Sequence, residues 1–193
     1  MQTEADCTFW DTVPGYFLAD DRSNPSRAIA AGIIQREVEA GAWFMLEIGP
    51  CLGFDYEDHL RRIHKLTYTG YEGSATCCQN LERRFGAGIF QHKTFKDLQR
   101  LSFDIIYTKA TLEHQPDFQY ALNQMLMAAK RLVLINWYRP PAEVPITEFN
   151  TKIQLHSNTY KKADVVAAIL ATGRKLEIRE VPKSTNVLYL IHS

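Results

Sequence analysis

The sequence predicts an α/β protein with a doubly wound, mostly parallel sheet, helices on both faces and a C-terminal antiparallel hairpin. Two observations carry this prediction. Short apolar runs alternate along the chain with stretches of helical periodicity, as in right-handed strand–helix–strand units. The last two apolar runs, residues 176–181 and 186–191, are separated by a short polar segment beginning with Pro182, which is typical of a hairpin.

Caps and chain breakers set the expected limits of the elements. Asn24, Asp55 and Ser74 each precede a helical pattern and can cap its first turn. Gly41 and Gly86 are expected to end two of these helices. The predicted helices are residues 25–41, a short one after Asp55, 74–85, 116–129 and 159–171. The predicted strands are residues 43–46, 67–71, 89–92, the run beginning at 103, 132–136 and the two strands of the hairpin.

Length and charge restrict the class of protein. The 193 residues are expected to form one domain, with residues 1–23 as an aromatic N-terminal flap and residues 24–193 as the core. Basic and acidic residues number 22 each, so there is no overall field to hold nucleic acid, and no such partner is expected. No membrane partner is expected either. The polar N-terminus and the lack of a run of about twenty apolar residues predict a cytoplasmic location.

The cysteines do not have the spacing of a metal site. Cys7, Cys51 and the adjacent Cys77 and Cys78 contain no Cys-x-x-Cys pair. Structural zinc sites usually need such pairs or a comparable histidine spacing. We therefore expect reduced thiols and no metal.

The most informative segment is Glu47-Ile48-Gly49-Pro50-Cys51-Leu52-Gly53, which follows an apolar run. A strand that breaks into closely spaced glycines brings a nucleotide-like ligand close to bare backbone at the carboxyl edge of a sheet. Dinucleotide-binding loops place glycines at the first, third and sixth positions. Here Gly49 and Gly53 are four residues apart, and an acid, Glu47, precedes the first. An alternative is that the two glycines only permit a tight strand-to-helix turn.

This arrangement resembles motif I of the class I S-adenosylmethionine-dependent methyltransferases. Two later segments match the same family in the right order: residues 68–72, a strand ending in the acid Glu72, and residues 103–114, which resemble the fourth strand and following loop of its small-molecule, type 11-like branch. The resemblance implies a Rossmann-like seven-stranded sheet. It also implies methyl transfer from S-adenosyl-L-methionine to an oxygen or nitrogen of a small metabolite or sugar-containing intermediate, with S-adenosyl-L-homocysteine as the product.

The resemblance also implies positions for the cofactor. Glu72 would accept hydrogen bonds from both ribose hydroxyls, and Glu47 would act near the methionine end at longer range or through water. Asp97 would meet the adenine amino group, whereas Phe95 either lies against the adenine or belongs to the core. The other residues expected in the cofactor site are Gly49, Pro50, Cys51, Gly53, Gly73, Thr108 and Lys109.

Two departures from the family pattern leave other functions open. Cys51 replaces the middle glycine of motif I, and His92-Lys93 stands where many relatives have Gly-Asp. One alternative is therefore a catalytically silent relative that serves as a partner or scaffold. Another is a different nucleotide-binding enzyme, such as an NAD-dependent oxidoreductase or epimerase. The glycine spacing and the lack of a helical Tyr-x-x-x-Lys pair disfavour this second alternative.

Candidate residues for proton transfer and acceptor binding come from the loops. His114, His156, Tyr160 and Tyr16 are the candidate acid–base groups, because imidazole titrates near neutrality and tyrosine carries a polar hydroxyl. The alternative for His114 is that its segment supports the cofactor pocket without transferring a proton. An apolar wall around a small-molecule acceptor is expected from Trp10, Tyr16, Trp137 and Tyr138.

Overall fold

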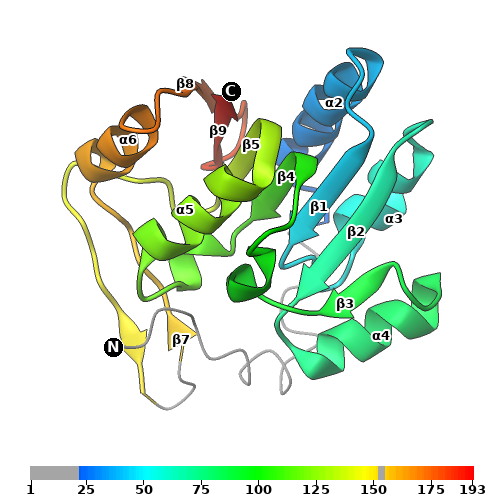
Figure 1. Cartoon of the computed structure of the whole chain (residues 1–193). Coiled ribbons are helices and arrows are strands. Elements are labelled where there is room, and N and C mark those ends of the chain that lie inside the picture. Colours follow the sequence, from blue (N-terminus) through cyan, green and yellow to red (C-terminus); the bar gives the residue numbers. More distant parts are fainter. Residues whose placement is uncertain (1–21, 152–154) are drawn as a thin grey trace.

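The computed structural model describes residues 22–151 and 155–193, and its centre is a seven-stranded sheet of order β3-β2-β1-β4-β5-β9-β8 (Figure 1). Strands β1 to β5 pair in parallel, and β9 is antiparallel to both β5 and β8. This arrangement confirms the predicted Rossmann-like α/β fold with a C-terminal hairpin.

The strands occupy β1 Phe44–Ile48, β2 Thr67–Glu72, β3 Phe90–His92, β4 Phe103–Lys109, β5 Ala129–Trp137, β6 Phe149–Asn150, β7 Leu155–His156, β8 Lys175–Glu180 and β9 Val187–His192. The α-helices occupy α2 Pro25–Glu39, α3 Phe54–Asp58, α4 Ala75–Phe85, α5 Phe118–Ala128 and α6 Lys162–Leu170. Short 3₁₀ helices lie at Leu60–Arg62, Phe95–Leu98 and Leu112–His114. The small β6–β7 hairpin was not predicted, because each of its strands has only two residues.

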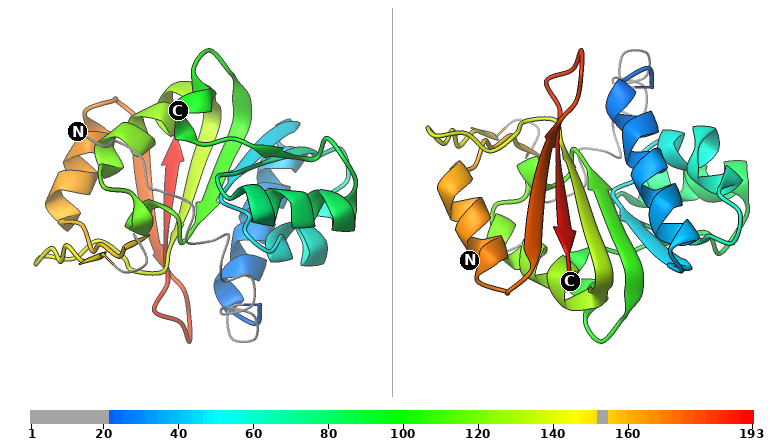
Figure 2. Two further views of the ribbon diagram at one scale, coloured as in Figure 1. Left: turned by 90° about the horizontal axis from the view of Figure 1, so that it is seen from below. Right: turned by 90° about the horizontal axis from the view of Figure 1, so that it is seen from above.

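Helices cover both faces of the sheet (Figure 2). On one face α2 buries Ile33 and Ile34 against side chains of β1, β4, β5 and β9. On the other face α5 and α6 pack against the alternate side chains of the same strands, with Met125 and Ile169 fully buried. Because side chains alternate across a strand, central strands buried on both faces read as continuous apolar runs. This explains why these strands appear in the sequence as continuous apolar runs and not as an alternation of apolar and polar residues.

The helix after Gly53 differs from the prediction that Asp55 caps it. Gly53, with a φ of 72°, is the residue before the helix, and Asp55 lies in its first turn. The Asp55 carboxylate does not cap the backbone because it forms a buried ion pair with Arg27 of α2. The predicted helix from residue 159 also starts later, at Lys162, because Thr159 and Lys161 form β-bridges with Ile146 and Ala142.

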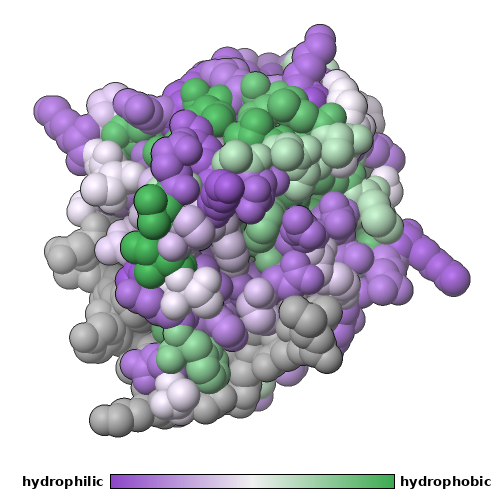
Figure 3. All heavy atoms as spheres, turned by 90° about the vertical axis from the view of Figure 1, so that its left-hand side faces the viewer, coloured by the Kyte–Doolittle hydropathy of each residue, from purple (hydrophilic) through white to green (hydrophobic). Residues whose placement is uncertain are grey.

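The outer face of α6 and β8 is partly apolar. Leu170 and Ile178 are exposed, and Figure 3 views the molecule from the side on which α6 lies in Figure 1, with hydrophobic surface gathered towards the top. Charged side chains alternate with the apolar ones along β8, and Glu177 accepts a hydrogen bond from Arg179. Charges on an edge strand oppose edge-to-edge pairing. Among the described residues, no helix is long and apolar enough to cross a membrane.

A chain of amide side chains fixes the start of α2 against β5 and β9. Asn136 Nδ2 donates to Ser26 Oγ at 2.9 Å, and Asn186 Nδ2 donates to Asn136 Oδ1 at 2.9 Å. Asn24 Nδ2 donates to Asn186 Oδ1 at 2.9 Å, while Asn24 Oδ1 accepts the N–H of Ser26 as the predicted cap. Because Asn136 and Asn186 are buried, these bonds satisfy amides that would otherwise be costly to bury.

Asn136→Ala is expected to lower the free energy of unfolding by about 2 kcal/mol, because it leaves the Asn186 amide and the Ser26 hydroxyl without their buried partner. Urea denaturation measures this change. The matched control is Asn123→Ala on the exposed side of α5, for which little change is expected. An equal loss in both variants would show that the buried amide chain does not stabilise the fold.

Candidate functional site

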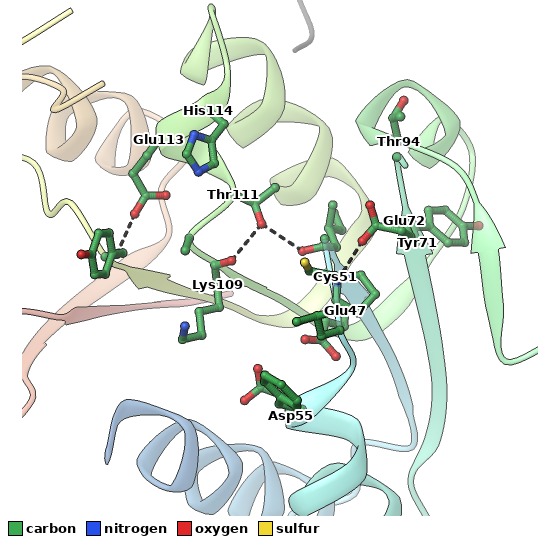
Figure 4. Close-up of a pocket in the computed structure, with 18 of the residues that line it drawn as sticks. Glu47, Cys51, Asp55, Tyr71, Glu72, Thr94, Lys109, Thr111, Glu113 and His114 are labelled. Atoms are coloured by element: carbon green, nitrogen blue, oxygen red, sulfur yellow. Dashed lines mark hydrogen bonds between the residues drawn. The ribbon is translucent and has the colours of Figure 1, made fainter. Parts of the chain in front are cut away.

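A cavity of about 760 Å³ opens at the carboxyl edge of the sheet (Figure 4). Its walls come from the loops after β1 to β5, the first turns of α2 and α3, and the start of β7. This volume lies within the range of small-molecule pockets, and the edge between β1 and β4 is where ligands of open α/β sheets bind.

The cavity brings together most of the predicted site residues. Those that line it are Glu47, Gly49, Pro50, Cys51, Glu72, Gly73, Phe95, Lys109, His114 and Tyr138. Predicted residues outside the lining are Gly53, Asp97, Thr108, Trp137, His156 and Tyr160. Trp10 and Tyr16 lie outside the described residues. Polar lining residues that sequence reasoning did not place in the site include Arg27, Asp55, Lys93, Thr111, Glu113, Arg139 and Ser157.

The loop after β1 contains three residues in the left-handed region, Gly49, Cys51 and Gly53, with φ of 73°, 51° and 72°. A Cβ at Gly49 would lie 2.5 Å from Oγ1 of Thr111, and a Cβ at Gly53 would lie 2.6 Å from Cδ2 of Leu81. A Cβ at either position would displace these side chains, and the left-handed backbone would add strain. Cys51 adopts a conformation that is costly for a residue with a Cβ, and it is half-buried in the cavity wall.

The Glu72 carboxylate is held in place at the end of β2. Its Oε2 accepts the N–H of Cys51 at 2.8 Å, and its Oε1 accepts the N–H of Ser74 at 2.8 Å. The residue is 5% exposed and lines the cavity. Each carboxylate oxygen can accept more than one hydrogen bond. A fixed carboxylate at this edge can therefore receive two adjacent hydroxyl groups of a ligand.

A second polar group lies beside the start of the loop, at Glu47. Its carboxylate is 2% exposed, and Oε2 accepts the Tyr68 hydroxyl at 2.5 Å. Burial, together with the nearby charge of Asp55, raises the pKa of Glu47 to about 8. Asp55 is itself paired with Arg27, whose side chain is 8% exposed. The sequence did not signal this pair, because an arginine in a first helical turn is usually solvated.

The loop after β3 does not use Asp97 as predicted. Its Oδ2 accepts the N–H of Thr94 at 2.9 Å in a capping box, which explains why the carboxylate does not line the cavity. Phe95 is 3% exposed and belongs to the core, yet it also forms part of the cavity wall. Lys93 lines the cavity, and its Nζ lies 4.9 Å from the centre of the Tyr71 ring.

Glu113, which follows β4, connects two walls of the cavity. Its Oε1 accepts the N–H groups of Tyr138 at 2.6 Å and Arg139 at 3.0 Å, in the loop after β5. Burial raises the pKa of this carboxyl group. Thr108, at the end of β4, donates from Oγ1 to the Ile48 carbonyl at 3.0 Å, so it ties β4 to β1 without reaching the cavity.

The imidazole ring of His114 is held by a hydrogen bond at one of its nitrogens. Its Nδ1 lies 2.6 Å from the carbonyl oxygen of His156, and a carbonyl only accepts, so Nδ1 carries the proton. Burial lowers the pKa of His114, which favours the neutral ring near pH 7. The lone pair is then on Nε2. Figure 4 shows His114 beside Glu113 and Thr111 on the β4 side of the cavity.

The other two predicted acid–base groups have positions outside the cavity wall. The His156 ring packs against Phe149 at 4.6 Å between centroids, and its backbone carbonyl holds His114. The Tyr160 hydroxyl donates to the Leu112 carbonyl at 2.8 Å, and burial raises the pKa of this phenol. Both residues therefore support the loop after β4.

The predicted aromatic wall is also partly wrong. Trp137 is 0% exposed and packs edge-on against Tyr160 and Tyr189, because its position in β5 points it into the core between the sheet and the helices. Tyr138, the next residue, is 56% exposed and lines the cavity. Successive side chains of an extended segment point in opposite directions, so Trp137 enters the core whereas Tyr138 lines the cavity.

No protein-family model and no curated protein matches the sequence. Solved structures do match. An O-methyltransferase family protein from Burkholderia thailandensis is 12% identical with a TM-score of 0.61, over 86% of this chain and 55% of that one. Magnesium protoporphyrin IX methyltransferase (ChlM) from Synechocystis PCC 6803 with bound SAM is 10% identical with a TM-score of 0.68, over 96% and 89%. CalS10, an amino pentose methyltransferase from Micromonospora echinaspora, is 11% identical with a TM-score of 0.67, over 86% and 89%.

These likenesses establish the fold. The chain has the class I fold of these solved methyltransferases, as its motifs predicted. The match spans 55% of the Burkholderia chain, so it covers only part of that protein.

Glu47→Gln is expected to remove a pH dependence of stability. With a pKa raised from 4.5 to about 8, the folded protein keeps the Glu47 proton where the unfolded chain has lost it. The free energy of unfolding of the wild type should therefore fall as the pH rises from about 4.5 to 8. Over this pH range, the difference in the free energy of unfolding between the wild type and Glu47→Gln should change by about 1 kcal/mol or more. Urea denaturation at several pH values measures it, with the exposed Glu143→Gln as control. A constant difference would contradict the raised pKa.

Cys51→Gly is expected to bind an adenosyl ligand equally well or more tightly. Glycine relieves a left-handed strain of about 1–2 kcal/mol and removes a side chain from the cavity wall. Glycine also gives the unfolded chain more conformational entropy, which offsets part of the relieved strain. The free energy of unfolding should therefore change by about 1 kcal/mol or less. Lys65→Gly, at an exposed residue with a φ of 68°, is the matched control. A large loss of affinity confined to Cys51→Gly would show that the thiol contacts the ligand.

Proposed function

We propose that the protein transfers a methyl group from S-adenosyl-L-methionine to an oxygen or nitrogen atom of a small molecule, such as a metabolite or a sugar-containing intermediate. The observation that carries the proposal is the buried Glu72 carboxylate, fixed by two backbone N–H groups at the wall of a 760 Å³ cavity. Glu72 ends β2, where the sequence resemblance leads us to expect the ribose-binding acid, and solved structures with this fold contain the cofactor, as in ChlM with bound SAM.

The described residues fit this cofactor. Glu72 would accept both ribose hydroxyls, and the backbone of residues 49–53 would follow the methionine chain. Glu47 offers a carboxyl oxygen that can accept a hydrogen bond from the ammonium group of the amino-acid end, and Arg27 offers N–H donors for its carboxylate. Phe95 provides an apolar surface for the adenine.

The protein's part in the reaction is mainly positioning. When bound, the cofactor supplies an activated methyl group on a sulfonium centre. The loops after β4 and β5 would hold the acceptor against it, because these loops form the part of the cavity that the cofactor residues leave. Holding two reactants in line accounts for a large share of such rate enhancements.

His114 is our choice among the candidate bases. Of His114, His156 and Tyr160, it is the one whose side chain lines the cavity. Its Nδ1–H is fixed by the His156 carbonyl, so Nε2 would take the proton from a hydroxyl or amine acceptor as the methyl group is transferred. Glu113 acts on the other wall, where it positions the backbone of residues 138 and 139.

Glu72→Ala is expected to weaken cofactor binding by about 1–3 kcal/mol, the scale for losing a charged hydrogen-bond partner. Calorimetric titration with S-adenosylmethionine and S-adenosylhomocysteine, and with NAD for comparison, measures this. Glu180→Ala removes an exposed carboxylate at the end of β8 and serves as the matched control.

Micromolar binding of either adenosyl ligand, lost in Glu72→Ala and kept in the control, is the expected result. Unchanged affinity in a folded Glu72→Ala protein would contradict the ribose assignment. No adenosyl binding at all would favour the partner or scaffold alternative, and binding of NAD would favour a different nucleotide-dependent enzyme.

A further inference from the structure

The order of the strands fixes where the base of a nucleoside ligand would lie. Strand β2 lies between β1 and β3, so Glu72 at its end has the glycine loop after β1 on one side and the segment after β3 on the other. Figure 4 shows Glu72 with Cys51 on one side and Thr94 on the other. Because the loop after β1 is assigned to the methionine chain and Glu72 to the ribose, the base is left with the segment after β3. Lys93, Thr94 and Phe95 of that segment line the cavity.

The base end of the cavity, formed by residues 93–95, has no carboxylate among the residues that the structure describes. Asp97, the acid of the same segment, accepts the Thr94 N–H with its Oδ2 at 2.9 Å and does not line the cavity. This bond also uses the backbone donor of Thr94. Apart from Glu72, the acids that line the cavity come from β1, α3 and the segment after β4, namely Glu47, Asp55 and Glu113. The amino group of adenine is a hydrogen-bond donor, so it meets no carboxylate at this end.

Lys93 brings a cation to the base end. Its backbone N–H donates to the Glu72 carbonyl at 3.2 Å, so the residue adjoins the proposed ribose position. Its Nζ lies 4.9 Å from the centre of the Tyr71 ring and 3.4 Å from the Tyr71 hydroxyl. Tyr71 is 3% exposed and packs edge-on against Phe103, so the lysine side chain lies against a fixed ring.

The Lys93 ammonium group keeps hydrogen-bond capacity for a ligand. An ammonium group has three donors and no acceptor. Within residues 22–151 and 155–193, its one hydrogen bond is the long one to the Tyr71 hydroxyl. The remaining donors can bind only acceptor atoms. Its neighbour Thr94 adds a hydroxyl, which can both donate and accept and is the other polar side-chain group of the base end.

We propose that Lys93 recognises the base by donating a hydrogen bond to an acceptor atom on its edge, so that the site binds a 6-oxopurine nucleoside at least as tightly as the adenine one. A lysine can donate to both O6 and N7 of a 6-oxopurine, whereas adenine has an amino donor at position 6. The inference rests on the proposed cofactor, because it places the ribose on Glu72. It also gives a role to the lysine of His92-Lys93, a departure from the family pattern that the proposed function leaves unused.

The test is calorimetric titration of the whole protein with S-adenosylhomocysteine and with its 6-oxo analogue, S-inosylhomocysteine. Three variants probe the base end. Lys93→Met removes the donors and keeps an apolar stem, Lys93→Gln replaces the ammonium group with a carboxamide, and Thr94→Val removes the competing hydroxyl. Lys96→Met, at an exposed lysine in the 3₁₀ helix Phe95–Leu98, is the matched control. Circular dichroism establishes that each variant is folded.

In the wild type, S-inosylhomocysteine should bind at least as tightly as S-adenosylhomocysteine. Lys93→Met should weaken binding of the inosyl ligand about tenfold, the scale for losing a hydrogen bond from a charged donor. Lys93→Gln should shift the preference towards the adenosyl ligand, because a carboxamide pairs with the amino group and N7 of adenine. Lys96→Met and Thr94→Val should leave the preference unchanged.

Tighter binding of the adenosyl ligand to the wild type would overturn the inference. If Thr94→Val removed that preference, the threonine hydroxyl and not Lys93 would recognise the base. A preference that is the same in the wild type and in both folded Lys93 variants would also overturn the inference. In these cases, S-adenosylhomocysteine binding that is lost in Glu72→Ala leaves the cofactor proposal standing. If neither ligand binds, both proposals are wrong.

Discussion

The site depends on the parallel pairing of β1 with β2 on one side and with β4 on the other. Parallel strands end at the same edge, so this pairing brings three loops together. The pairing continues beyond the strands: Gly49 N–H donates to the Tyr71 carbonyl at 2.8 Å, and Thr108 Oγ1 donates to the Ile48 carbonyl at 3.0 Å. The loop after β1 is therefore fixed from both sides before any ligand arrives, which reduces the ordering that binding requires.

Carboxylates in this fold serve two purposes that depend on their partners. Glu113 and Asp97 accept backbone N–H groups and so fix the loops after β5 and β3. Glu72 also accepts backbone N–H groups, but it does so at the cavity wall, where its oxygens remain within reach of a ligand. Glu47 accepts a hydrogen bond from a phenol and forms no ion pair with the residues that the structure describes, so burial and the charge of Asp55 raise its pKa. Position and partner, and not residue type, separate these roles.

Much of the fold could be predicted, because apolar runs, caps and chain breakers are local signals. Ser74 caps α4 as expected, and its side chain accepts the N–H of Cys77. The cofactor side was also predictable, since Glu47 and Glu72 sit at strand ends within a motif. Arg27 and Glu113 could not be found this way, because their roles come from contacts with residues distant in sequence. Trp137 was misplaced because sequence alone does not give the side of a strand on which a residue at its end points.

The amide chain at the start of α2 has a consequence for how the protein is made. Asn24 and Asn186 are 162 positions apart, yet they share a hydrogen bond beside the cavity. Strand β9, which follows Asn186, lies between β5 and β8 and is added to the sheet after all the other strands have been synthesised. The first turn of α2, which carries Arg27, therefore gains its final support only when the last part of the fold has left the ribosome. A nascent chain can assemble β1 to β5 early, but its binding cavity matures late.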